Sequence, residues 1–169
     1  MRPIIIAYIF LFVVCFTGCS KENTVQEEPE TQFTFRVKKN GLEWKVTTAK
    51  GFYNKDDGTC HVSGVGENNE HLHFTFKKYP QRTGKLDEFH SGVIIPSCPI
   101  CASLSASYTL NSVETNKLEI IGFDNIQNRI IGQFNVQLKR ERLYDSEDFD
   151  EELNTYEGLF SVRYEDIGL

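Results

Sequence analysis

Apolar and polar residues alternate along much of this chain, which is the pattern of half-buried β-strands. In residues 33–38 (FTFRVK) and 42–47 (LEWKVT) the apolar side chains fall on one face and the polar ones on the other. Asn40-Gly41 lies between these runs and is a strong hairpin signal, because both residues tolerate positive φ. The sequence therefore predicts a β-hairpin with Trp44 on its core-facing side.

The same alternation recurs in six further segments, separated by short polar turns such as 124–128 (DNIQN). The expected strands lie in residues 60–64, 72–76, 102–110, 118–123, 134–139 and 159–164. No segment after the first apolar run keeps a helical period of 3.6 residues. Short strands separated by turns predict an all-β domain, a single antiparallel meander that forms either a barrel or a sandwich.

The N-terminus has the layout of a lipoprotein signal peptide. Arg2 precedes an apolar run from Ile4 to Phe16, which is shorter than the roughly 20 residues of a membrane-spanning helix. Gly18-Cys19 follows without an A-x-A cleavage pattern and resembles the lipobox of bacterial lipoproteins, although Phe16 stands where that family usually has Leu. The resemblance implies acylation of Cys19 and cleavage of the leader before it. The alternative is an ordinary secretory leader in which Cys19 is incidental.

We therefore expect a signal peptide over residues 1–18, a lipidated and flexible tether over 19–32, and the all-β domain over 33–167. Residues 20–30 (SKENTVQEEPE) contain one apolar residue and cannot pack, so they suit a solvated tether. Ser20 is not the Asp that retains lipoproteins at the inner membrane, and Lys21-Glu22 resembles surface-export signals of Bacteroidota lipoproteins. The expected location is the outer membrane, on its periplasmic or its exposed side.

Charge bounds the expected partners. The formal net charge is −6, and such an acidic chain gains little from neutralising phosphates, so nucleic acid is not expected. The membrane is the first expected partner, through Cys19. The second is an envelope protein or a small ligand, and no cofactor is expected.

Three histidines form the sharpest candidate for chemistry. His71 and His73 lie two residues apart on an expected strand and therefore share its polar face. If residues 60–64 pair with this strand, His61 lands on the same face. Three imidazoles on adjacent strands suit zinc or copper. Three solvent-exposed histidines without a ligand are the alternative.

The cysteines suggest a local disulfide. Cys98 and Cys101 form a CxxC motif, and a chain exported to the envelope favours their oxidation. No βαβ pattern surrounds the motif, which argues against a thioredoxin-type enzyme. Cys60 is in phase with Val62, so we expect a buried thiol.

An acidic run over residues 145–152 (DSEDFDEE) separates the last two expected strands. Its oxygen-bearing side chains are possible calcium ligands, but no EF-hand spacing is present. A solvated hairpin tip is therefore the simpler interpretation.

Three longer motifs carry a family resemblance. They are FTFRVxxNGxxW at the start of the domain, LEIIGFD followed by RIIGQFNV, and YEGxFSV near the end. Together they resemble small outer-membrane lipoproteins of the Bacteroidota type that carry an all-β domain of unknown function. The resemblance implies place and fold, and no activity. No catalytic motif is present. We therefore expect a non-enzymatic binding or accessory domain, with metal binding as the alternative.

Overall fold

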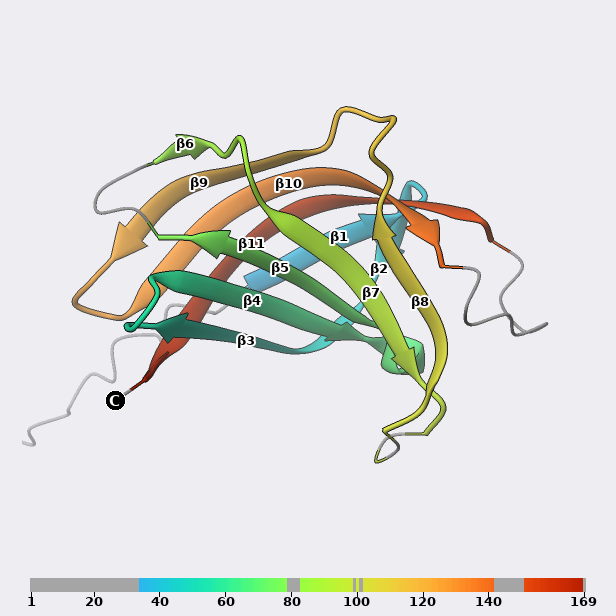
Figure 1. The fold of residues 1–169 in the computed structure, drawn as a ribbon, viewed down its shortest axis with the longest axis horizontal. Coiled ribbons are helices and arrows are strands. Elements are labelled where there is room, and N and C mark those ends of the chain that lie inside the picture. Colours follow the sequence, from blue (N-terminus) through green and yellow to red (C-terminus); the bar gives the residue numbers. More distant parts are fainter. Residues whose placement is uncertain (1–33, 79–82, 99, 101, 142–150, 169) are drawn as a thin grey trace, which may run out of the picture. The chain divides into compact units, whose positions relative to one another are not determined.

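The computed structural model of the chain describes residues 34–78, 83–98, 100, 102–141 and 151–168, which belong to one compact unit, Gln32–Leu169. The expectation of an all-β fold is confirmed (Figure 1). The elements are β1 (Thr34–Lys39), β2 (Leu42–Trp44), β3 (Val46–Asn54), β4 (Thr59–Gly66), a 3₁₀ turn (Glu67–Asn69), β5 (His71–Lys77), β6 (Gly84–Lys85), β7 (His90–Pro96), β8 (Leu104–Leu110), β9 (Lys117–Asp124), β10 (Arg129–Arg140) and β11 (Leu153–Ile167).

The predicted hairpin is confirmed. β1 and β2 pair antiparallel around Asn40 and Gly41, whose φ values are 51° and 80°. Both values lie in the left-handed region that a tight two-residue turn requires. Trp44 is 8% exposed on the core side, as its phase predicts.

Seven of the described strands close into a ring. Their order is β11-β3-β4-β5-β7-β8-β10, and β10 then pairs with β11 again. The sequence left the choice between a barrel and a sandwich open. The closed ring of strands makes the fold a barrel. Every strand pair among the described residues is antiparallel except β3 with β11, which is parallel from Tyr164↔Gly51 to Ile167↔Asn54. The sheet is thus mixed rather than a purely antiparallel meander.

The length of β11 explains its parallel pairing with β3. β11 is 15 residues long, so one edge accommodates two partners in succession. Residues 156–161 pair with β1, and residues 164–167 then pair with β3. β10 uses the same device, pairing with β9 over 129–135 and with β8 over 138–140. These two long strands pair with each other and join the hairpins into one sheet.

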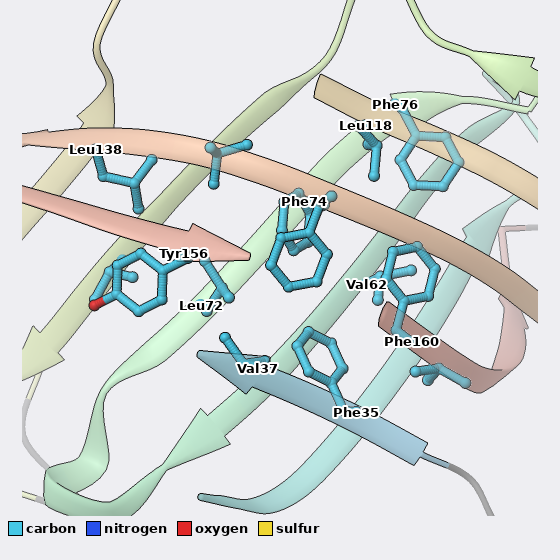
Figure 2. Packing of buried hydrophobic residues seen from close by; sticks show 14 of the residues in the cluster. Phe35, Val37, Val62, Leu72, Phe74, Phe76, Leu118, Leu138, Tyr156 and Phe160 are labelled. Atoms are coloured by element: carbon cyan, nitrogen blue, oxygen red, sulfur yellow. The ribbon is translucent and has the colours of Figure 1, made fainter. Parts of the chain in front are cut away.

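Aromatic side chains fill the interior of the ring (Figure 2). Phe35, Phe74, Phe134 and Phe160 come from four different strands, and their ring centroids lie 4.6–6.4 Å apart. Phe74 and Phe160 have no exposed surface. Such contacts add to the free energy gained by burying the rings, so they fix how the strands of this sheet pack.

Candidate functional site

The three predicted histidines lie on the outer face of the ring. Val62 pairs with Phe74 inside, so the odd-numbered residues of β4 and β5 point outward, as expected. His61 lies opposite Thr75 rather than opposite a histidine, and its Nδ1 is 3.0 Å from the Thr75 hydroxyl. The shared face is confirmed.

The imidazoles nevertheless have separate surroundings. His71 Nε2 lies 3.1 Å from the amide oxygen of Asn69, and the His73 ring covers Gly92, where an added Cβ would be 3.0 Å from Cε1. Burial lowers the pKa of His73, and repulsion from His61 lowers it further. Within the described residues, no group of three or more His, Cys, Asp or Glu side chains could hold a metal ion. Metal binding stays a prediction that this geometry does not support.

The cysteines differ in their state. Cys60 is fully buried, as its phase predicts, and burial raises the pKa of its thiol to about 12. Cys98 is disulfide-bonded, and its partner lies outside the described residues. Cys101 also lies outside them, so the Cys98–Cys101 pair stays a prediction.

Two other predicted features fall outside the described residues: Cys19 with its tether, and residues 145–150 of the acidic run. No helix within the described part of the chain is long and apolar enough to cross a membrane.

A groove of about 810 Å³ lies against β1, β2, β9, β10 and β11. We call it the outer groove, because most of the residues that line it alternate with core residues and point away from the ring. The core residues Phe35, Val37, Trp44 and Phe134, with Val46, complete the lining. Gly158 of β11 lies in its lining, and an added Cβ there would be 2.1 Å from the Arg36 carbonyl oxygen. Glycine therefore lets β1 approach β11 closely. The outward side chains of the outer groove are Arg36, Lys38, Glu43, Lys45, Lys117, Glu119, Gln133, Asn135, Glu157 and Leu159.

Strand register arranges these side chains in two rows that cross the sheet. The first row is Lys117, Asn135, Glu157, Lys38 and Glu43, one residue from each strand and each directly opposite the next. The second row is Glu119, Gln133, Leu159 and Arg36. Adjacent rows on one face lie about 7 Å apart, so long side chains from both rows can contact a single ligand.

Only some of the charges in the outer groove are compensated within the described structure. Lys38 lies 3.8 Å from Glu157, and Gln133 donates a 2.7 Å hydrogen bond to Glu119. Lys45 pairs with Glu67 outside the groove at 3.1 Å. Arg36, Lys117 and Glu43 have no ion pair with another described residue. With respect to the described residues, the groove therefore presents two cations and one anion without an ion pair, on a chain whose net charge is −6.

A buried carboxylate lies behind the outer groove. Glu70 is 5% exposed, accepts a 2.8 Å hydrogen bond from Trp44 Nε1 and lies 2.9 Å from Lys39 Nζ. Burial alone would lower the pKa of Lys39, but its hydrogen bonds to Glu70 and Glu151 raise that pKa above the ordinary value. Lys39 therefore stays charged, and Glu70 is compensated by both partners.

Two tyrosines adjoin the same carboxylate. Burial raises the pKa of Tyr156, and the charge of Glu70 raises it further. The Tyr156 hydroxyl is near Glu70 but makes no hydrogen bond of ordinary geometry. Burial also raises the pKa of Tyr108. In both cases burial favours the protonated phenol.

Trp44 connects this buried cluster to the outer groove. Trp44 is among the residues that line the groove, and its indole packs on Gly66, where an added Cβ would be 2.3 Å from the ring. The indole also meets the Tyr156 ring edge to face at 5.9 Å. These contacts fix β2, and with it the position of Glu43 at one end of the first row.

A second cluster consists of three aromatic rings around the Lys78 ammonium. The Lys78 ammonium lies 4.5 Å from the Tyr53 ring, 4.6 Å from the Tyr164 ring and 5.3 Å from the Phe123 ring. It also donates a 2.9 Å hydrogen bond to the Tyr164 hydroxyl. The cation thus occupies its own cage, which stabilises the junction of β3 and β11.

Sequence reasoning missed Glu70, Lys78 and the outer groove. The one signal for Glu70 was Trp44, since a buried indole N–H requires an acceptor. The rows of the groove depend on pairings between strands that are distant in the sequence, and no local motif predicts these pairings.

Comparison with known proteins adds no relative: no family model, no curated protein and no solved structure matches this chain. The resemblance to Bacteroidota lipoproteins therefore stays a prediction.

Proposed function

We propose that this protein is an envelope lipoprotein, anchored to the outer membrane through Cys19, whose β domain is a non-enzymatic binding or accessory domain. The observation that carries the proposal is the outer groove. Five strands contribute its side chains, and its charged and amide groups surround one exposed apolar residue, Leu159. Polar groups in fixed positions around apolar surface are typical of binding sites.

The tether suits a displayed domain. Fourteen positions, 20–33, separate Cys19 from the start of β1. Fully extended they span at most about 50 Å, and as a flexible coil about 20 Å. The groove would therefore meet partners near the membrane surface without being fixed against it.

Site-specific photo-crosslinking in cells tests the role of the groove. A photoreactive residue replaces Leu159 in the groove, and a second strain carries it at Lys50, an exposed position of β3 outside the groove. We expect a discrete adduct, identified by mass spectrometry, at 159 and not at 50. Equal labelling at both positions, or none at 159, would contradict the groove as the binding site.

The histidine alternative has its own test. Native mass spectrometry of the full chain, purified without chelators, reports bound zinc or copper directly. A bound ion that disappears in the double variant H71A/H73A would establish that alternative. Uptake that is unchanged in the variant would exclude it.

A further inference from the structure

The charges of the outer groove narrow the chemistry of its ligand. We propose that the groove binds an extended, acidic peptide segment of a partner protein, an inference that rests on the proposed function. Arg36 and Lys117 are the groups that would read its carboxylates. Both are exposed, both line the groove, and neither has an ion pair with another described residue.

Charge complementarity favours an anionic ligand. The outward side chains of the outer groove include Arg36, Lys38, Lys45 and Lys117 against Glu43, Glu119 and Glu157, whereas the whole chain has 18 basic and 24 acidic residues. Two of the three carboxylates already have a partner, at Lys38 and at Gln133. An acidic segment would therefore be attracted to the groove, because the rest of this acidic chain repels it.

The spacing of the two free cations fits an extended peptide. Lys117 is on β9 and Arg36 on β1, so three strand spacings and one step between rows separate them, about 16 Å. Side chains at positions i and i+4 of an extended peptide lie on one face about 14 Å apart. The long lysine and arginine side chains bridge the remaining gap.

The centre of the groove is suited to a peptide backbone. Gln133 and Asn135 lie between the two cations, and side-chain amides both donate to and accept from peptide groups. Leu159, 43% exposed, offers an apolar contact beside them. An acidic polysaccharide shares the charge but gains less from this centre, so it is the competing outcome of the test.

Fluorescence anisotropy tests the proposal with the acylated full chain in nanodiscs of zwitterionic lipid. The probes are labelled hexaglutamate, hexalysine and hexagalacturonate. We expect hexaglutamate to bind more tightly than the other two, and its affinity to fall as salt rises. Hexagalacturonate binding as tightly or more tightly would overturn the peptide in favour of an acidic polysaccharide.

Charge reversal locates the binding. The double variant R36E/K117E should weaken hexaglutamate binding at least tenfold. Its matched control, K50E/K77E, makes the same change in net charge at two exposed strand positions, on β3 and β5, that neither line the groove nor pair with a residue that does, and it should change binding less than twofold. Equal effects of the two variants, or no binding by the unaltered chain, would overturn the proposal. A crosslinked partner at 159 with no charge dependence would overturn this inference and leave the proposed function standing.

Discussion

At the scale of single residues, the buried Glu70 carboxylate is the partner of both a half-buried cation and a buried indole N–H. It compensates Lys39 and accepts from the Trp44 indole. When it is removed, the indole loses its acceptor and Lys39 keeps the exposed Glu151, 3.2 Å away. We expect E70A to lower the free energy of unfolding by about 3 kcal/mol, measured by urea denaturation. E70Q should cost less, because an amide oxygen can still accept from the indole.

The control is E67A. The Glu67 side chain is 59% exposed and pairs with Lys45 across solvent, so its loss should cost less than about 1 kcal/mol. Similar losses for E70A and E67A would show that burial of the Glu70 pair contributes little.

Gly66 is a second residue whose identity is dictated by contact. An added methyl group there would lie 2.3 Å from the indole, so Trp44 must move. G66A should destabilise the fold by about 2 kcal/mol and change the fluorescence of Trp44, the one tryptophan in the chain. G122A is the matched control, because an added Cβ at Gly122 meets nothing within 4 Å. An unchanged emission spectrum in G66A would contradict this packing.

The Cys60 thiol should be inert in the folded protein. Its pKa rises from 9.0 to about 12 because burial penalises the thiolate. We expect thiol reagents at pH 8 to modify Cys60 only in denaturant. The unfolded chain releases this proton near pH 9 and the folded chain only near pH 12, so the stability contributed by the buried thiol falls as pH rises between these values. Modification in buffer alone would contradict the burial.

At the scale of elements, the β1–β2 turn is attached to β11 by its own asparagine. Asn40 donates a 2.8 Å hydrogen bond to the Asn154 amide oxygen and accepts one of 2.8 Å from the Thr155 N–H. N40A removes both bonds and places alanine at a φ of 51°, so we expect a loss of about 2–3 kcal/mol in thermal or urea unfolding.

Asn128 separates the two causes. It has the same φ of 51°, and its side chain makes no hydrogen bond with another described residue. N128A should therefore show the conformational cost alone, about 1 kcal/mol. If both variants lose the same stability, the bonds to β11 contribute nothing.

The sequence predicted those elements that are determined by residues close together in the chain. The Asn40-Gly41 hairpin and the phase of Trp44 depend on neighbouring residues and were predictable. β7 was not, because Ser91, Gly92 and Val93 are buried in succession and show no alternation. The His73 ring covers the outer side of Gly92, so burial there comes from the neighbouring strand.

The outer groove was not predicted from the sequence either, because it too depends on contacts between distant strands. Alternation assigns Arg36 and Lys117 to the outer face, but it does not say which strands lie beside them. That depends on β1 pairing with β11 and β9 with β10, and the first of these pairings joins residues more than a hundred positions apart. The histidines shared a predictable face, while their ring directions depend on Asn69, Thr75 and Gly92.

At the scale of the whole molecule, the proposed anchor is the most direct target. Replacing Cys19 with alanine should remove the acylation site and release the protein from membranes into the soluble fraction, because several acyl chains give practically permanent binding. C15A is the control, since Cys15 lies in the expected leader and would be removed with it. Fractionation with an antibody to the β domain measures both. Membrane retention of C19A would contradict the lipid anchor.

The position of β11 has a consequence for how the molecule acquires its structure. β11 follows every other described strand in the sequence, yet it provides the partner of β1, the parallel partner of β3 and the closing edge for β10. In a chain emerging from its N-terminus, β1 can pair with β2 and β3 with β4, but the edges of β1 and β3 that pair with β11 stay open until the last strand is free. Such long-range pairings slow folding. Under the proposed export of this chain across a membrane, the late closure would delay compaction until nearly all of the domain has emerged on the far side.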